Sequence, residues 1–558
     1  MKKIFKLTQN ELVKMLKKKS TIILVSILVL ISAGIPIISS MSIYEYDDRE
    51  NYLHRIKWAE EQLLEIKDDD DGSLKIKNEI IHLELEIDMY QTMYDENISY
   101  NDWRNDYYLN VIDNRYVSKF LNIIDEKQFP EVAQEFLGHI PEVSNLLQTN
   151  YTIDDIKKVA KQYEKKADGY LNNIIDDNFK EYLKEQKFIY ENELIDHKEA
   201  ITNLEIQLKE NPDDYEILNS LKSIKQNVIS NELNIKLMDA QMKSTDFSNT
   251  ENRKKYDNML RFSEEHIYKI SRTKLTEDEF NLDYHCKNKY DTYENYVEIF
   301  DRNVESEKEN FDLLLYAIEN NIPDYSSTNS TRYSIFGILG FMLFICIIIS
   351  VFAGGIVSKE YSTGTIRLLL IRPASRNKIL ISKLLALLFI AIGLVIISFI
   401  SISISSIIAY GVEDISYPIL SIKDGVISKC NIFIYLIPKI LISFSPIIFA
   451  ISLAFAISTV TKITALSVGL SVAVIGFSMP FTQILMQFNK LNCIVPYLPT
   501  TYVYYSDFLQ ANNSYMMEVL SRLSVNVTAG FGAIVFAVYS AVFLTISFIV
   551  FNKRDVLN

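Results

Sequence analysis

The sequence contains few of the residues that build metal sites and disulfides. Its 558 residues include only four cysteines and six histidines. The histidines are scattered, and no two of them have the spacing of three or four residues that a metal site on a helix uses. Cys286 is the one cysteine between residues 42 and 330, so that segment cannot contain an internal disulfide. A bound metal is therefore not expected, and the segment must fold on its own hydrophobic core.

Several motifs of enzymes and pumps are also missing. The chain has no GxxxxGK[ST] phosphate loop, no HExxH, no GxSxG and no CxxC. Its long apolar runs contain no acidic residue, which argues against a transporter that works through a relay of protonated carboxylates. We therefore expect a non-catalytic chain with no cofactor of its own. If the chain moves a solute, the energy comes from another protein.

Charge is divided unevenly along the chain. Residues 42–330 hold 63 of the 71 acidic and 35 of the 57 basic residues, a net charge of -28, whereas the remainder has a net charge of +14. Two parts of opposite charge predict two different environments. The acidic surface is expected to be mainly a solvated face that could attract a cationic peptide, and a nucleic acid partner is not expected.

Six apolar runs are long enough to cross a bilayer as helices. They are residues 21–41, 333–357, about 384–410, about 440–459, 465–485 and 531–551. The segments 1–20, 358–383, the turn at Lys462 and the residues after 551 together carry a net charge of +13. By the positive-inside rule, both termini are cytoplasmic and residues 42–330 lie outside the cell. The sequence thus predicts an all-α membrane protein with six transmembrane helices, multi-pass in the plasma membrane.

Two segments near these runs have alternative interpretations. A cleaved signal peptide would also begin with lysines and an apolar run, but the run is long and no A-x-A site follows it, so a first membrane helix is favoured. Residues 1–20 interleave apolar residues with lysines, which is typical of a helix lying on an anionic inner leaflet. Lys439 follows the short apolar piece 431–438, where an interfacial anchor is favoured over a place in a substrate path.

The acidic segment is predicted to be mainly helical. Apolar residues alternate at spacings of four and three over residues 76–94, 190–208 and 217–238. The last two runs flank the sequence NPDD and predict an antiparallel coiled-coil hairpin over about residues 183–242. Thr276 and Glu279 form a capping-box pattern, which predicts the start of a long helix toward Asn320. The less regular residues between about 100 and 177 are expected to form a compact helical head.

The connection EYSTGTIRLLLIRPASRNKILISK, residues 360–383, is the most informative stretch. It resembles the first cytoplasmic loop of the permeases of type-2 ABC exporters (the ABC-2 type transporter family). In that family an acidic residue, a Gly-Thr pair, a basic and apolar run and a Pro-x-Ser-Arg precede the third span. The matching positions are Glu360, Gly364, Thr365, Arg367, Arg372, Pro373, Ser375, Arg376 and Lys383. The resemblance implies that residues 358–383 form a coupling helix that rests in a groove of an ATPase subunit. The alternative is a basic loop that only fixes topology.

Three further segments share the resemblance. Residues 1–20 resemble the amphipathic elbow helix of the family, and residues 551–556 resemble its usual ending. Residues 486–530, with Pro496, Pro499 and several tyrosines, resemble short helices that re-enter the membrane from outside and shield the exit; an aromatic belt is the alternative. The resemblance covers residues 1–41 and 331–558 and leaves out the acidic segment, which a compact member replaces with a short loop.

The resemblance implies a bacterial permease subunit that exports a peptide, antibiotic or lipid-like substrate. Its partners would be a second permease chain, identical or homologous, and two cytoplasmic ATPase subunits that hold ATP and Mg. By charge, the outside segment would suit cationic antimicrobial peptides, and hence resistance to them, or a cell-wall component. Two alternatives remain at this point. One is a mechanotransmission subunit that moves its outside domain, and the other is a surface receptor or scaffold.

Overall fold

The computed structural model describes residues 2–41, 48–68, 71–100, 102–212, 214–290, 292–323, 330–367, 375–423, 425–486, 488, 493–509 and 527–553. Helices account for nearly all regular structure in these residues, and the predicted all-α class is confirmed. One antiparallel hairpin of strands β1 (Ile419–Lys423) and β2 (Val426–Cys430) occurs in this part of the chain. The chain forms two compact units, residues 1–43, 274–313 and 322–558 in the first and residues 44–273 and 314–321 in the second.

The first unit contains the apolar helices. Five of them are long and apolar enough to cross a membrane, and a sixth span is possible if one bent pair is counted. The five are α2 (Lys19–Met41), the run of α16 to α18 (Thr331–Ser362), α20 (Arg376–Tyr410), the run of α21 and α22 (Ile432–Val460) and α27 (Ala529–Lys553). The pair is α23 (Thr464–Gly476) and α24 (Ser478–Met486), which meet at a bend of 49°. Six spans therefore match the prediction when the bent pair crosses as one.

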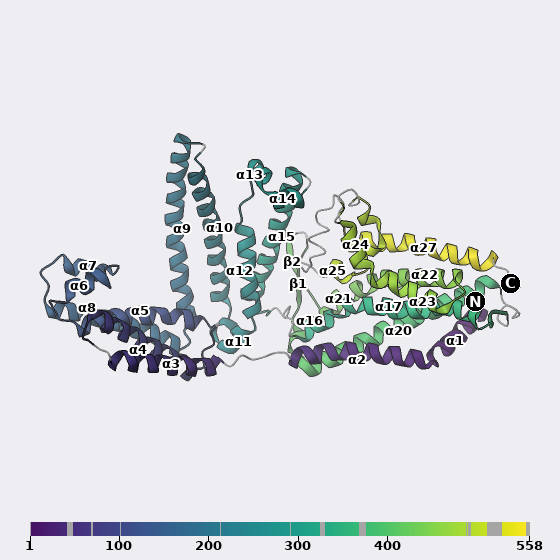
Figure 1. Ribbon diagram of the computed structural model, residues 1–558, viewed down its shortest axis with the longest axis horizontal. Coiled ribbons are helices and arrows are strands. Elements are labelled where there is room, and N and C mark those ends of the chain that lie inside the picture. The colour runs from purple at the N-terminus through teal and green to yellow at the C-terminus, as the bar shows by residue number, and fades with distance from the viewer. Residues whose placement is uncertain are drawn as a thin grey trace. The chain divides into compact units, whose positions relative to one another are not determined.

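Helix α17 (Ile338–Ile356) lies at the centre of this unit. It packs against α20, α22 and α23, while α27 covers α22 and α2 covers α20 (Figure 1). In the apolar 18-residue segment of each helix, only 22% of the residues are buried in α2 and 28% in α27, against 61% in the run that contains α17. Exposed apolar helices around a buried one are the arrangement expected when lipid, and not water, surrounds the outer helices.

The predicted interfacial piece 431–438 is part of a longer helical run. Asn431 accepts a hydrogen bond from the backbone N–H of Phe433 and so caps α21 (Ile432–Ile442). Helix α22 (Phe444–Val460) follows after Ser443. The combined run of 29 residues is longer than the roughly 20 that a bilayer core requires, so the first turns of α21 can extend beyond the hydrocarbon.

The second unit begins with a helical head. It contains α3 (Asp48–Asp68), α4 (Leu74–Asp95), α5 (Trp103–Ile123), α6 (Phe129–Glu135), α7 (Pro141–Leu147) and α8 (Ile153–Ile175). One core lies around Phe120, Phe129 and Ile156, and a second, aromatic core lies around Tyr52, Tyr107 and Tyr108. These buried side chains explain how the head folds without a disulfide.

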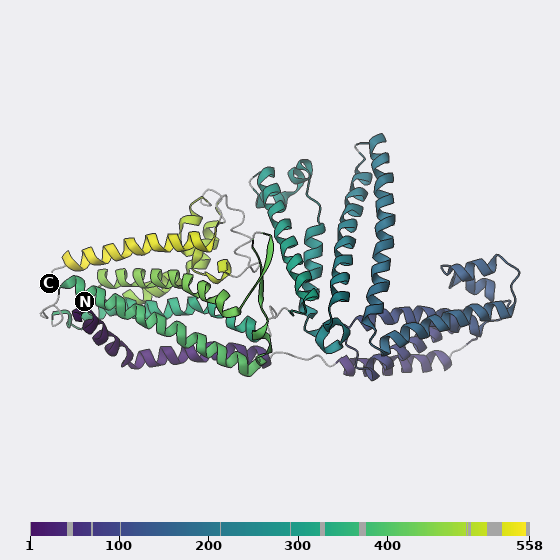
Figure 2. The same ribbon diagram turned by 180° about the vertical axis from the view of Figure 1, so that it is seen from behind.

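Two long helices, α9 (Phe179–Glu210) and α10 (Tyr215–Lys243), form a hairpin in the same unit (Figure 2). The contacts between them show that the two helices are antiparallel, because residues early in α9 contact residues late in α10. Lys187 lies 2.6 Å from Asp239, Asn231 donates to Glu193 at 3.0 Å, and Lys225 lies 2.8 Å from Glu205. Asp214 caps α10 by accepting from the N–H groups of Glu216 and Ile217. The helices occupy the two runs in which apolar residues alternate at spacings of four and three. After them come η1 (Asp246–Ser248), α11 (Thr250–Lys254) and α12 (Asp257–Ser271).

The helix predicted from the capping box at Thr276 is shorter than expected. The capping box forms, but α13 (Glu277–Leu282) ends after six residues. Asp283 then accepts from the N–H groups of His285 and Cys286 and begins α14 (Tyr284–Lys289), and α15 (Tyr293–Glu319) follows. The prediction of one long helix from Thr276 toward Asn320 is therefore wrong, and the long helix begins only at Tyr293. The Asp283 side chain caps a new helix, and this competes with continuation of the first one.

Candidate functional site

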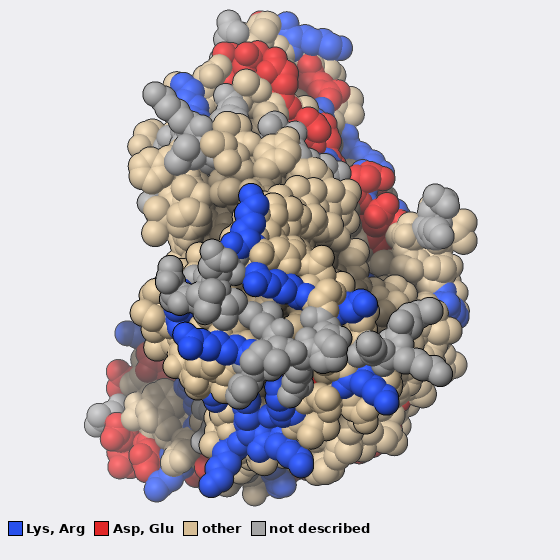
Figure 3. Space-filling model, turned by 90° about the vertical axis from the view of Figure 1, so that its right-hand side faces the viewer, with Lys and Arg blue, Asp and Glu red and all other residues tan. Residues whose placement is uncertain are grey.

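The start of α1 (Lys2–Leu16), the end of α27 and the end of α17 lie at one end of the first unit, and Arg376 at the start of α20 contacts the end of α27 there (Figure 1). Figure 3 views this end and shows Lys and Arg side chains gathered on it. Exposed basic residues of these segments include Lys14, Lys17, Lys359, Arg367, Lys378 and Lys553, and Lys462 is exposed in the turn between α22 and α23. Positive charge at one end of a membrane bundle is typical of its cytoplasmic side. The predicted coupling residues belong to this basic end.

Lys383 is buried in α20 and holds three parts of the chain together. Its side chain is 1% exposed, and its ammonium nitrogen Nζ lies 2.7 Å from Glu360 Oε1 and 2.9 Å from Glu11 Oε2. It also donates to the carbonyl of Ile356 at 3.4 Å. Glu360 belongs to α18 (Ser358–Ser362) and Glu11 to α1 (Lys2–Leu16). The two ends of the predicted coupling loop therefore meet each other and the N-terminal helix at one ammonium group.

The charges of this cluster compensate one another. A buried charge costs several kcal/mol unless it is paired and hydrogen-bonded. Burial alone would raise the pKa of Glu11, but the charge and hydrogen bond of Lys383 outweigh it and, with Lys14 at 3.1 Å, hold that pKa below its ordinary value. Glu11 is therefore ionised at neutral pH, and the ion pair with Lys383 is intact there.

Serine side chains fix the start of the loop. Ser458 of α22 accepts hydrogen bonds from the backbone N–H groups of Val357 and Ser358, at 3.1 and 3.0 Å. Ser358 and Ser467 of α23 both donate to the carbonyl of Gly354, at 2.7 Å each. These bonds satisfy backbone groups that the break between α17 and α18 leaves open. The loop start is therefore attached to both α22 and α23.

Gly364 makes the turn that follows α18. Its φ is +73°, a left-handed conformation that a side chain with a Cβ rarely adopts. Around it, the Thr363 hydroxyl donates to the carbonyl of Lys359 at 2.7 Å and lies 2.9 Å from the hydroxyl of Thr365. The Gly-Thr pair thus has a local structural role: Gly364 permits the turn, and the hydroxyl of Thr365 stabilises it together with that of Thr363.

Arg376 anchors the other end of the loop to the last membrane helix. Its guanidinium Nη1 donates to the carbonyls of Asn552 and Phe551, at 2.8 and 3.3 Å. Asn552 in turn donates to Asn377 at 2.6 Å. A cation at the C-terminal end of α27 also has a favourable interaction with the helix dipole. Ser375, at the N-cap of α20, makes no side-chain cap bond.

The structure places seven of the nine predicted coupling residues. It brings Glu360 and Lys383 into contact, gives Gly364 and Thr365 one turn, leaves Arg367 exposed and ties Arg376 to α27. Arg372 and Pro373 lie outside the described residues. Sequence reasoning missed Glu11, although it is the single acidic residue among the seven lysines of residues 1–20. An isolated acidic residue in a basic segment was the signal that could have found it.

The described part of the predicted re-entrant region packs near the start of α27, at the opposite end of that helix from the predicted coupling loop. It contains η4 (Val495–Tyr497), η5 (Pro499–Tyr502) and α25 (Ser506–Leu509). The Tyr502 hydroxyl donates to the carbonyl of Pro496 at 2.8 Å, and Tyr505 donates to the carbonyl of Ala529. Lys439 donates to Tyr435 at 2.6 Å and to the carbonyl of Leu509. Lys439 therefore connects α21 to α25. Residues 487, 489–492 and 510–526 of the predicted region lie outside the described residues.

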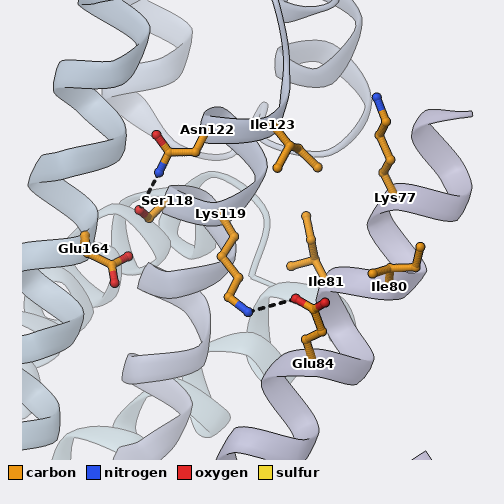
Figure 4. Close-up of a pocket in the computed structure, with 9 residues that line it drawn as sticks. All are labelled: Lys77, Ile80, Ile81, Glu84, Ser118, Lys119, Asn122, Ile123 and Glu164. Carbon is orange, nitrogen blue, oxygen red and sulfur yellow. Dashed lines mark hydrogen bonds and ion pairs between the residues drawn. The ribbon is translucent and has the colours of Figure 1, made fainter. Parts of the chain in front are cut away.

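A separate pocket of about 440 Å³ lies in the head of the second unit, between α4, α5 and α8 (Figure 4). Its wall combines Ile80, Ile81 and Ile123 with charged residues, and Lys119 forms an ion pair with Glu84 at 3.1 Å across it. This mixed lining favours no single class of ligand. In the part of the chain that the structure describes, no three His, Cys, Asp or Glu side chains are grouped as a metal site.

Comparisons with known proteins agree with the geometry of the membrane unit. The uncharacterized protein YhcI of Bacillus subtilis (strain 168) is 29% identical over 255 residues, which are 45% of this chain and 77% of that protein. No solved structure matches the chain. A family model described as ABC-2 family transporter protein matches residues 6–556, nearly the whole chain.

Proposed function

This chain belongs to the ABC-2 family of transporter proteins, and on that premise we propose that it is an exporter subunit driven by separate cytoplasmic ATPase subunits. The family assignment and the apolar helices make it a multi-pass membrane subunit of an ABC transporter. Export, coupling through residues 358–383 and the position of residues 42–330 outside the cell are parts of the proposal.

The observation that carries the proposal is the attachment of both loop ends to the helices. Lys383 connects Glu360 with α1, Ser458 fixes the loop start to α22, and Arg376 fixes the loop end to α27. A force applied to the exposed part of such a loop cannot be absorbed by the loop alone. It moves several membrane helices together, which is the mechanical requirement for coupling ATP hydrolysis to transport.

The number of spans favours an exporter over mechanotransmission. Mechanotransmission subunits usually have four spans, whereas this chain has five long apolar helices and a bent pair. The proposed assembly contains two permease chains, identical or homologous, and two ATPase subunits with ATP and Mg. The proposed substrate is a peptide, antibiotic or lipid-like molecule, and the acidic charge of residues 42–330 favours a cationic peptide.

Gly364→Val tests the coupling role of the loop. Valine at a φ of +73° is strained by roughly 1–2 kcal/mol, so it should displace the turn after α18. We expect the copurified complex to keep its ATPase subunits but to hydrolyse ATP about tenfold more slowly in membranes. Gly425→Val is the matched control, because Gly425 also has a φ of +73° and open space around it but lies in the β1–β2 turn.

Two results would oppose the proposal. If Gly364→Val and Gly425→Val hydrolyse ATP at the same rate as the unaltered complex, the loop does not couple the ATPase to the helices. If the unaltered chain purifies from solubilised membranes without any nucleotide-binding subunit, a surface receptor or scaffold becomes the favoured interpretation over an exporter.

A further inference from the structure

Helix α1 has three distinct faces. Thr8, Glu11 and Met15 are buried on the face that packs against α20. Phe5, Val13 and Leu16 are 68%, 45% and 56% exposed. At 3.6 residues per turn these three lie within about 80° of one another. The exposed Lys6 and Lys14 of α1 occupy the adjoining roughly 80°, together with Lys17, which directly follows the helix and whose N–H donates to the carbonyl of Val13. An exposed apolar stripe therefore borders a basic stripe along the helix.

The position of α1 identifies what covers its exposed stripe. Only Lys17 and Lys18 separate α1 from the membrane helix α2, and the Thr21 hydroxyl donates to the carbonyl of Met15 at 2.6 Å. Figure 1 shows α1 inclined to α2. The exposed stripe thus begins within a turn of the bilayer surface. Apolar side chains beside lysines at that depth match acyl chains beside anionic headgroups.

The buried face of α1 leads from the lipid surface to the loop. Glu11 lies 2.9 Å from Lys383, and Lys383 lies 2.7 Å from Glu360 at the start of residues 358–383. A change in how α1 rests on the bilayer moves Glu11, because the carboxylate and the exposed stripe belong to one rigid helix of 15 residues. Lys383 contacts both carboxylates, so α1 and the loop are linked through one ammonium group.

We propose that α1 binds the anionic phospholipids of the inner leaflet and that the contact of Glu11, Lys383 and Glu360 transmits this binding to the loop. Lipid composition would then set the resting arrangement of residues 358–367. The importance of that arrangement for ATP hydrolysis rests on the proposed function, whereas lipid binding and the loop response do not.

The lipid contact is tested with Phe5→Trp in nanodiscs of brominated phosphatidylcholine, with and without phosphatidylglycerol. The two natural tryptophans, Trp58 and Trp103, belong to the second unit, so the difference from the unaltered chain reports position 5. We expect phosphatidylglycerol to increase quenching of the new tryptophan. Adding Lys6→Gln and Lys17→Gln removes two charges, each of which contributes about 1 kcal/mol of attraction to an anionic surface. The equilibrium constant for docking of α1 on the bilayer should therefore fall about 30-fold, at about tenfold per 1.4 kcal/mol. The control Lys378→Gln with Lys462→Gln removes two exposed charges from the same end and should change it little.

The link to the loop is tested by hydrogen exchange of residues 358–367 in the same nanodiscs. Phosphatidylglycerol should slow exchange in the unaltered chain, whereas Glu11→Gln should keep lipid quenching and lose the loop response. If Glu11→Gln does not fold, the Lys6 and Lys17 variant carries the test, since its loop response should also be lost. An unquenched tryptophan, as when a protein covers the stripe, would overturn the proposal. The proposal would also be overturned if the control pair lost as much quenching as the Lys6 and Lys17 variant. It would likewise be overturned if phosphatidylglycerol slowed exchange of residues 358–367 in Glu11→Gln as it does in the unaltered chain. No readout uses ATP, so failure here is separable from failure of the exporter proposal.

Discussion

Replacing Lys383 with methionine is expected to destabilise the membrane unit by about 3–5 kcal/mol. The substitution keeps most of the length and the apolar stem of the side chain but removes the ammonium that pairs with both Glu11 and Glu360. Both carboxylates are then left in a site where their side chains are only 11% and 14% exposed. Thermal unfolding of the purified chain in detergent measures the loss, and hydrogen exchange should rise in α1 and in residues 358–367.

Two comparisons separate the charge cluster from a general effect of altering α20. Lys378→Met changes an exposed lysine of the same helix and should shift stability by no more than about 0.5 kcal/mol. The triple variant Glu11→Gln, Glu360→Gln and Lys383→Met should regain most of the loss, because a neutral buried site avoids unpaired charges. A Lys383→Met protein that unfolds like the unaltered chain would contradict the pairing.

Gly532→Ala is expected to separate η5 from the last membrane helix. A Cβ at Gly532 would lie 2.5 Å from Tyr502 Cδ1 and 2.8 Å from Cγ. The Tyr502 ring is fully buried and its hydroxyl is held by the carbonyl of Pro496, so it cannot rotate away freely. Overpacking of this kind costs about 1–3 kcal/mol, and the severity of the clash places this case at the upper end.

Hydrogen exchange of residues 493–509 measures this separation most directly. Exchange there should rise strongly in Gly532→Ala, together with a lower unfolding temperature. Gly530→Ala is the control two residues earlier, because its added Cβ would come no closer than 3.9 Å to the side chain of Thr528. Equal protection of residues 493–509 in the two variants would show that Tyr502 does not rest against Gly532 as described.

Membrane helices could be predicted from the sequence because their cause is local. A run of about 20 apolar residues must form a helix in hydrocarbon, where unpaired backbone groups are too costly. The same reasoning missed the bend between α23 and α24, which apolarity alone does not encode. The β1–β2 hairpin also went unnoticed, although Asp424 and Gly425 between two alternating runs are a typical hairpin signal.

The predicted coupling residues show the limit of reasoning from one segment. Gly364 was singled out through the resemblance of its segment to the family's loop, and its structural role is a local turn. The role of Lys383 depends on Glu11, which lies 372 residues away in the chain, and no local pattern connects the two. Arg376 likewise depends on carbonyls of Phe551 and Asn552. Contacts of this range follow from the packing of α1 and α27 against α20, and packing is a property of the whole fold.

In the proposed function, Lys383 links the loop mechanically to the membrane helices of an ATP-driven exporter. ATP hydrolysis by the copurified complex carrying Glu11→Gln, Glu360→Gln and Lys383→Met tests it most directly, because this variant should fold and assemble without the charge cluster. We expect the complex to keep its ATPase subunits but to lose the ATPase stimulation that the unaltered permease provides. Unchanged stimulation in a fully assembled complex would contradict it.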